Sequence, residues 1–132
     1  MRTETSLYGV VTKSANGSVA EVAANFRALL DTKGITVFAV IDQAAAAQTT
    51  NLTLRDTVLI IFGNPAAGTA VMAAAPLAGL DLPLKVLIWD DAGVTRLSYY
   101  SPETITDRHH LDPATTAGLS AINTLTDAVT NL

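Results

Sequence analysis

The sequence LKVLIWDDAGVTRLSYY at residues 84–100 decides the fold class. It holds two runs rich in apolar, β-branched and aromatic residues, Leu84–Trp89 and Val94–Tyr100, separated by DDAG at 90–93. Aspartate and glycine clustered between two such runs are typical of a β-hairpin turn. Because a short turn joins strands only in antiparallel order, this stretch predicts an antiparallel sheet.

Three more strands are predicted before this hairpin, at Leu7–Lys13, Ile35–Ile41 and Asp56–Phe62, from their apolar and β-branched residues. The first two flank a helix. Ser18 and Glu21 have the spacing of a capping box, and apolar residues recur after them at the helical period. A helix with one apolar stripe packs that stripe against a core.

Further helices follow the later strands. Asn64-Pro65 and Ser101-Pro102 each suit the cap and first position of a helix, and the first of these helices is expected to end before Pro76. The alanine-rich segment 42–50 is interpreted as a short helix or an ordered loop, and residues 119–132 as an amphipathic helix. The prediction is an α+β fold, a mainly antiparallel five-stranded sheet with helices on one face, in the order β-α-β-β-α-β-β-α.

Two of the predicted strands are too apolar for a face that meets water. Val58–Phe62 and Leu84–Trp89 lack the alternation of polar and apolar residues that a half-exposed strand shows. A homodimer interface or an apolar pocket under the loops would cover the second face of the sheet.

Composition limits the function classes. The chain has 132 residues, which fits a single domain over 1–132. It has no cysteine, which excludes disulfides and thiolate chemistry. A net charge of -4 argues against nucleic acid as a partner. The sequence shows neither a signal peptide nor an apolar run long enough to span a membrane, so a cytoplasmic location is expected.

The segment GNPAAGT at 63–69 is the first candidate site. It has the glycine spacing of a phosphate loop, but Thr69 stands where that motif needs lysine. A weaker function remains, because free N–H groups from Ala66 to Thr69 and the helix dipole favour a small anion. Gly63, Asn64, Gly68 and Thr69 are therefore ligand-binding candidates. The alternative is that Asn64 only caps the helix and Gly68 only permits close packing.

Four other side chains are weaker candidates. Lys85 can supply the cation that the 63–69 loop lacks, or be an ordinary surface lysine at a strand edge. Asp42 can be an acid–base group in apolar surroundings, or a cap for the following turn. His109 can carry a proton near neutral pH, and Tyr99 can contact a ligand beside Lys85.

Metal and cofactor sites find little support. The segment Arg108-His109-His110 holds the two histidines of the chain. Adjacent helical positions diverge by about 100°, so both rings do not easily bind one ion. The acidic residues nearby match no metal-ligand spacing. We therefore expect neither a metal nor a cofactor.

Several separated segments resemble one family. They are GNPAAGT at 63–69, LDLPLKVLIW at 80–89, Ile41-Asp42 with the alanines after it, and Tyr99 to Pro102 followed by Arg108-His109. Together they resemble the bacterial and archaeal domain of unknown function 302, from about Tyr8 to Leu111. The resemblance implies a fold of the TATA-binding-protein-like type, often dimeric, and no known reaction.

One residue departs from that family pattern. Gln43 stands where many relatives have histidine, so no role that needs an imidazole there is carried over. The DNA binding of the fold's namesake is not carried over either, because the chain is acidic.

Three functions follow from these observations. The first is a homodimeric domain that binds a small polar or anionic metabolite without catalysis, at the loop after Gly63. The second is an enzyme without metal or thiol that uses Asp42 or His109 as acid–base and Lys85 as electrophile. The third is a structural homodimer whose apolar sheet face is the interface.

Overall fold

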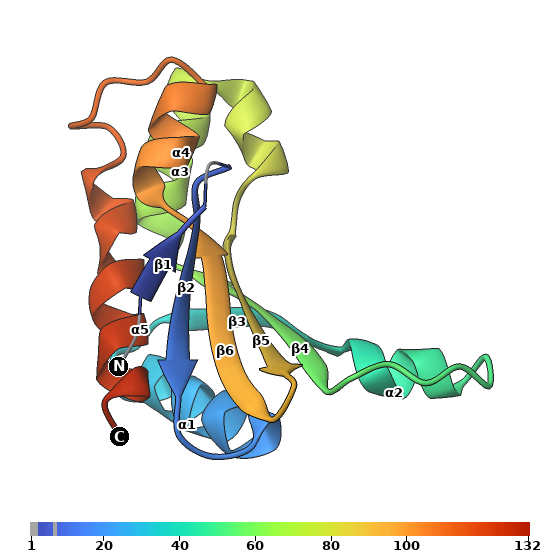
Figure 1. Cartoon of the computed structure of the whole chain (residues 1–132). Helices are drawn as coiled ribbons and strands as arrows, with labels where there is room; N and C mark the ends of the chain where they lie inside the picture. Colours follow the sequence, from blue (N-terminus) through green and yellow to red (C-terminus); the bar gives the residue numbers. More distant parts are fainter. Residues whose placement is uncertain (1–2, 7) are drawn as a thin grey trace.

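The computed structural model describes residues 3–6 and 8–132 and contains an antiparallel sheet with strand order β1-β2-β6-β5-β4-β3 (Figure 1). The antiparallel α+β prediction is confirmed, but the sheet has six strands instead of five. The additional strand, β1 (Thr3–Thr5), is short and polar, so its sequence carries no hydrophobic signal. The other strands are β2 (Val10–Ala15), β3 (Thr36–Asp42), β4 (Thr57–Gly63), β5 (Leu84–Asp91) and β6 (Val94–Tyr100).

The strand expected at Leu7–Lys13 starts later than predicted. β2 begins at Val10, after a turn that contains Gly9 at φ +77°, and Leu7 lies outside the described residues. The predicted β5–β6 hairpin is confirmed, with Ala92 at φ +50° and Gly93 at φ +96°. Two positive φ angles in succession are typical of the tight turns that match the twist of a hairpin.

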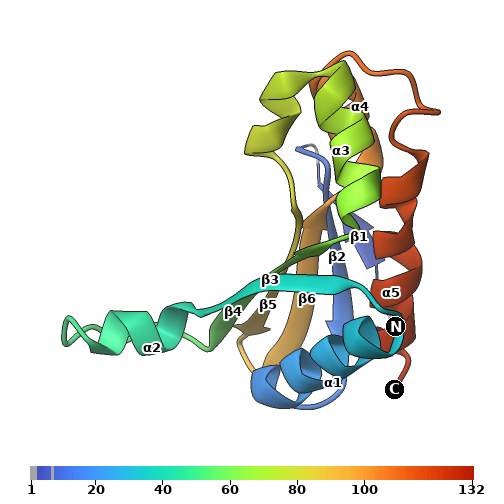
Figure 2. The same ribbon diagram turned by 180° about the vertical axis from the view of Figure 1, so that it is seen from behind.

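α1, α3 and α5 lie on the same side of the sheet, whereas α2 lies away from it (Figure 2). α1 and α5 pack against each other and against the strands. The capping box of Ser18 and Glu21 at the start of α1 is confirmed, as is the cap of Asn64 on α3. The helices are α1 (Val19–Thr32), α2 (Gln43–Gln48), α3 (Pro65–Ala74), α4 (Pro102–Arg108) and α5 (Ala121–Thr130), with 3₁₀ turns η1 (Pro76–Leu80) and η2 (Ala117–Ser120).

The core lies between the sheet and this helical layer. Phe26 of α1 meets Phe62 of β4 edge to face, with ring centroids 5.3 Å apart, and both side chains are fully buried. Lys13 of β2 is also in this layer, with only 3% of its surface exposed. Its ammonium forms an ion pair with Asp127 at 2.8 Å and donates to Thr126 Oγ1 at 2.6 Å. This charge is therefore buried with its partners in place.

On the opposite side of the sheet, which we call the open face, no helix of residues 3–6 and 8–132 lies across the strands (Figure 1). Strand alternation turns Leu59, Ile61, Leu87 and Trp89 toward it, and all four are half-buried. The residues between them are buried beneath the helices. Within the single chain, helices cover these apolar strands on one face, and the homodimer interface predicted for the other face stays a prediction.

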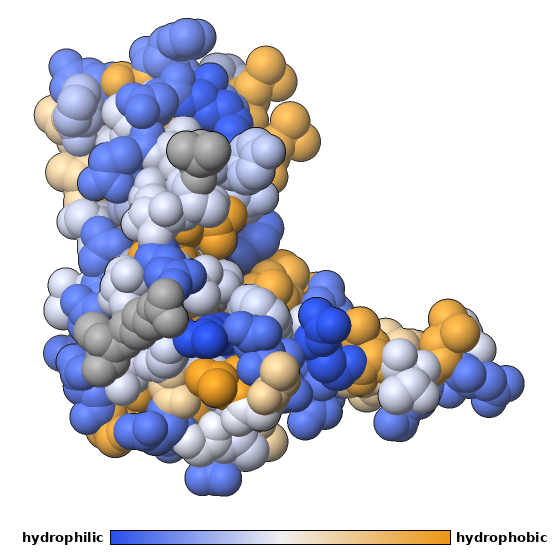
Figure 3. Space-filling model, viewed as in Figure 1, coloured by the Kyte–Doolittle hydropathy of each residue, from blue (hydrophilic) through white to orange (hydrophobic). Residues whose placement is uncertain are grey.

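α2 and the residues that follow it, 43–56 together, form an arm that projects from the rest of the molecule (Figures 1 and 2). The alanine-rich segment predicted as helix or loop is helical there, and Asp42 caps it by accepting from the N–H of Ala45 at 2.9 Å. Figure 3 shows hydrophobic residues on the arm and where it leaves the body. Leu52, near its tip, is 65% exposed.

Candidate functional site

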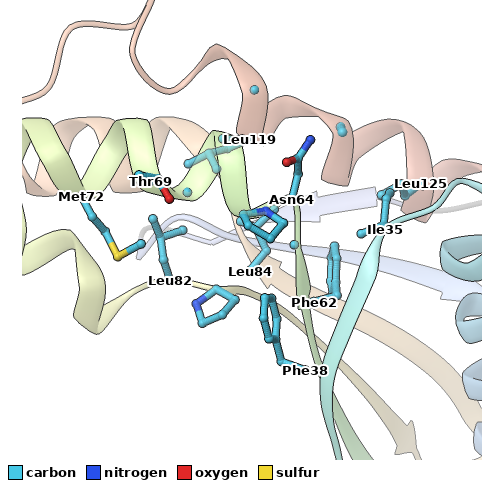
Figure 4. A pocket seen from close by; sticks show the side chains of 17 residues that line it. Ile35, Phe38, Phe62, Asn64, Thr69, Met72, Leu82, Leu84, Leu119 and Leu125 are labelled. Atoms are coloured by element: carbon cyan, nitrogen blue, oxygen red, sulfur yellow. The ribbon is translucent and has the colours of Figure 1, made fainter.

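A pocket of about 300 Å³ opens beside the first turn of α3, on the helix-covered side of the sheet, and we call it the helix-face pocket. Phe62 and Leu84, which are paired across β4 and β5, line it from the sheet. Met72 of α3, Leu119 of η2 and Leu125 of α5 line it from the helices (Figure 4). Its volume is at the lower end of the range for small-molecule pockets, roughly 300–1,000 Å³.

A β-bulge brings one aromatic ring to this pocket. The pairing of β3 with β4 shifts between Val37, opposite Phe62, and Ala39, opposite Ile61. Phe38 is the extra residue between them, and an extra residue bends a strand and redirects a side chain. Phe38 lines the pocket while half of its surface stays exposed. Figure 4 shows its ring on the same side of the pocket as Phe62.

The polar groups of the helix-face pocket belong to the start of α3. Asn64 accepts from the N–H of Ala66 at 2.9 Å through its side chain and from the N–H of Gly68 at 3.1 Å through its carbonyl. Two of the four N–H groups predicted to be free between Ala66 and Thr69 therefore have partners, and that part of the prediction is wrong. The Asn64 amide nitrogen donates to none of the described residues and can bind a ligand.

A second pocket, of about 390 Å³, lies on the other side of the sheet, and we call it the open-face pocket. Leu59, Leu87 and Ser98 line it from the open face, and Tyr100 and Leu80 line it near one end. Lys85 of β5 also lines the open-face pocket. Burial lowers the pKa of the Lys85 ammonium below its ordinary value, and the nearby Asp81 charge opposes that change.

Asp81 connects this pocket to α4. Its two carboxylate oxygens bind Arg108 Nη1 at 2.7 Å and His109 Nε2 at 2.6 Å. Its backbone carbonyl accepts from Lys85 Nζ at 3.1 Å, and the Pro83 carbonyl accepts from the same nitrogen at 3.1 Å. The four polar side chains of this network come from segments far apart in the sequence.

The residues predicted as one ligand site divide between the two pockets. Gly63, Asn64, Gly68 and Thr69 line the helix-face pocket. Lys85 and Tyr99 line the open-face pocket. Lys85 therefore does not supply a cation to the 63–69 loop. The reason is alternation along β5, since Leu84 turns toward the helices and its neighbour turns away.

Tyr99 has a structural partner of its own. Its hydroxyl donates to Asn123 Oδ1 at 2.7 Å, and the Lys13 ammonium lies 5.2 Å from the centre of its ring. The side chain is 4% exposed. These contacts hold the Tyr99 side chain in the core layer, so little of its surface is available to a ligand in the open-face pocket.

Of the two predicted acid–base arrangements, His109 and Lys85 are linked through Asp81, whereas Asp42 and Lys85 are not brought together. Asp42 pairs with Val58, and Lys85 pairs with Ile61 three residues farther along β4. Three strand residues span about 10 Å and two strand spacings another 10 Å or so, which places the α-carbons of Asp42 and Lys85 about 14 Å apart. Asp42 is exposed and serves as a helix cap, the second of its two predicted roles.

Several site residues were not found from the sequence. Phe38, Met72, Leu119 and Leu125 are apolar positions with no ligand-binding motif around them. The packing of η2 against α3 and α5, together with the bulge in β3, brings them together. The link between Asp81 and His109 spans 28 positions. Complementary charge at both ends was the one available signal.

Metal binding has no support in the described part of the chain, where no group of three or more histidine or acidic side chains is placed to hold an ion. His109 is bound to Asp81, and His110 follows it at φ +52°, outside α4.

These features define a class of protein: an α+β domain with one antiparallel sheet and a pocket on each side of it. Residues 10–132 match the family described as Domain of unknown function DUF302, and the chain belongs to that family. The crystal structure of an uncharacterized conserved DUF302 protein from Bacillus stearothermophilus has the same fold. Its TM-score is 0.77 and its identity 19%, over 93% of this chain and 96% of that one.

Curated relatives with other names also match. A protein of Brucella suis and one of Brucella abortus, each named fluoride-specific ion channel FluC 1, are 37% identical over 123 residues. The match takes in 92% of this chain and 48% and 46% of the two relatives, so the chain spans about half their length. Within residues 3–6 and 8–132, no helix combines the length and apolarity that crossing a bilayer requires.

Proposed function

We propose that this protein is a small-molecule-binding domain whose ligand occupies the helix-face pocket. One observation carries the proposal: the first turn of α3, predicted as a ligand site, borders a pocket of about 300 Å³. A core of this size is normally packed to crystal-like density, with few voids larger than a water molecule. An open apolar pocket at a helix start is therefore a feature that a ligand would stabilise.

The lining favours a mostly apolar ligand with one polar group. None of the described residues around the pocket is charged, and the polar side chains are Asn64 and Thr69. Burying an anion without a cation costs several kcal/mol, of the order of 2–7 for even a neutral polar group. An anionic ligand, the other candidate, would have to keep its charge at the rim, near the N–H of Ala67.

The test is a titration with benzyl alcohol followed by ¹⁵N NMR. We expect amide shifts at Asn64, Gly68 and Leu119, because they surround the pocket. Gly68→Leu adds a side chain next to Met72, whose Cε would lie 3.8 Å from a new Cβ, and should abolish the shifts. Ala66→Leu is the matched control on the same helix, exposed and outside the pocket, and should keep them.

Two results would end this proposal: no shift in the unmodified protein, or equal shifts with Gly68→Leu. Sodium fluoride is titrated in parallel, because fluoride is the ion in the names of the Brucella relatives. The apolar lining predicts no response at Asn64–Thr69. A fluoride shift centred on Ala67 would instead support the anionic ligand.

A second function, association with another copy of the chain, is favoured by the arm. The accessible surface is 7446 Å² for 13.7 kDa. A compact monomer of this mass exposes about 6,600 Å², so the chain has roughly 850 Å² in excess. Each subunit of a standard interface buries about 800 Å², a closely similar area. Such an excess, on an apolar arm, fits a homodimer.

Association is tested by sedimentation velocity between about 1 and 100 μM, a range that brackets micromolar affinity. We expect a dimer for the unmodified chain and a monomer for Leu52→Glu/Leu54→Glu, because both leucines are exposed on the arm. Leu77→Glu, at a 73% exposed site on η1, should stay dimeric. A monomeric unmodified chain at every concentration, or a dimer in the arm variant, would contradict this interface.

A further inference from the structure

The open-face pocket contains a cation that has no carboxylate of its own. Lys85 Nζ donates two hydrogen bonds, both to neutral backbone carbonyls, of Asp81 and Pro83. Within the described residues, no carboxylate oxygen forms an ion pair with it. An ammonium has three donors, so one N–H is left for another partner.

The nearest acid is already committed elsewhere. Both carboxylate oxygens of Asp81 are bound, one to Arg108 and one to His109. The cluster of Lys85, Asp81 and Arg108 therefore has one more positive than negative charge, even with His109 neutral. This local excess of positive charge occurs in a chain whose net charge is -4.

Lys13 shows what a satisfied lysine looks like in this fold. It is on the opposite, helix-covered side of the same sheet, and it has a carboxylate at 2.8 Å, a hydroxyl and a backbone carbonyl as partners. Lys85 has the carbonyls but neither of the other two. Lys85 therefore differs from Lys13 in lacking an oxygen acceptor that carries negative charge.

The other residues around Lys85 indicate the rest of a ligand's chemistry. Leu59, Leu87 and Leu80 provide apolar walls. The lining residues with a hydroxyl are Ser98, Tyr99 and Tyr100, and the Tyr99 hydroxyl is bound to Asn123. The Arg108 guanidinium lies 5.3 Å from the centre of the Tyr100 ring and holds that ring at the margin of the pocket. The volume, about 390 Å³, is that of a small-molecule site.

From this geometry we infer that the open-face pocket binds a small monocarboxylate with an apolar tail, its carboxylate on Lys85 and its tail against Leu59 and Leu87. The site is on the opposite side of the sheet from the helix-face pocket and does not depend on it. A charged hydrogen bond of this kind is worth about 1.5–3 kcal/mol, or roughly a tenfold to hundredfold change in affinity.

The test compares sodium octanoate with 1-octanol by ¹⁵N NMR titration. We expect octanoate to shift the amides of Lys85, Leu87 and Ser98 and to bind at least about tenfold more tightly than the alcohol. Lys85→Met keeps the length of the side chain without its charge, and should reduce octanoate affinity to that of octanol. Lys33→Met, at an exposed lysine after α1, is the matched control and should change neither affinity.

Three outcomes would overturn the inference. They are equal affinity of the unmodified protein for octanoate and octanol, unchanged octanoate binding in Lys85→Met, and octanoate shifts confined to the helix-face pocket around Asn64 and Leu119. The first comparison needs no variant, so it decides the question even if Lys85→Met does not fold. The proposed function is tested separately, by benzyl alcohol binding at the helix-face pocket, so the two proposals can fail independently.

Discussion

The two faces of the sheet are built from the same strands but differ in how far their side chains are buried. On β4 and β5 the residues toward the helices, such as Ile60 and Ile88, are fully buried, whereas Leu59 and Leu87 between them are half-buried. Both sets are apolar, so hydrophobicity alone does not distinguish them. The difference is that α1 and α5 pack on one face, whereas on the other face Leu80 of η1 and Ile105 of α4 only border a pocket.

The lysines repeat this contrast. Lys13, toward the helices, has an acidic partner on α5, whereas Lys85, toward the open face, does not. A covered face has to satisfy its polar groups within the chain, because water is excluded from it. On an uncovered face, solvent, a ligand or a second subunit can supply the hydrogen-bond partners of the polar groups.

The largest expected effect is the loss of unfolding free energy when a large apolar side chain is truncated on each face of the sheet. Phe26→Ala removes a fully buried ring from beneath the sheet and should cost about 3–5 kcal/mol of unfolding free energy. Leu87→Ala on the half-buried open face should cost about 1 kcal/mol of unfolding free energy, because folding removes less of the Leu87 side chain from contact with water. Urea unfolding at one fixed protein concentration measures both, and equal losses would show that the open face is covered in solution.

A smaller effect is expected when one ion pair on each face of the sheet is broken. Asp127→Asn removes the carboxylate partner of a buried ammonium and should cost about 1–2 kcal/mol, a value reduced because Asp127 itself is half-exposed. Asp91→Asn breaks the more exposed pair with Arg96 on the open face and should cost less than about 0.5 kcal/mol. A larger loss for Asp91→Asn, by the same urea measurement, would contradict the assignment of faces.

The smallest effect is a pH trend at Lys85. Its pKa is lower in the folded protein than the ordinary 10.5, so the unfolded chain binds the proton more tightly. The cost of burying the charge is therefore present below the lowered pKa and disappears as the pH rises toward 10.5. Thermal unfolding should show the stability difference between Lys85→Met and the unmodified protein changing over that window, in favour of the unmodified protein.

Solvent screens this half-buried group, so the change should stay below about 1 kcal/mol. Lys33→Met, at an exposed lysine, is measured alongside as the control for removing a lysine charge elsewhere on the surface. A constant difference for Lys85→Met from pH 7 to 10.5 would mean that burial does not perturb this lysine.

Much of the fold was predictable because its signals are local. The hairpin at 84–100, the capping box of Ser18 and the Asn64-Pro65 helix start each depend on residues a few positions apart, and all are present in the structure. β1 was missed because three polar residues show no periodicity, and it forms a strand only by pairing with β2.

The candidate site was predictable only in part. The sequence predicted a ligand site at the first turn of α3, and the helix-face pocket borders that turn; binding there stays a prediction. It did not identify Phe38, because a bulge in the β3–β4 pairing redirects that ring. The grouping of Lys85 with the 63–69 loop did not take the alternation of β5 into account, which was available from the pattern itself.

By itself, the amino-acid sequence determined which segments became strands and helices and where most of them were capped, since those preferences act between near neighbours in the chain. Only the tertiary structure decided which apolar face was covered, that the arm projects, and that Asp81 joins Lys85 to His109. Those outcomes depend on packing between segments tens of residues apart, and local propensity carries no information about such contacts.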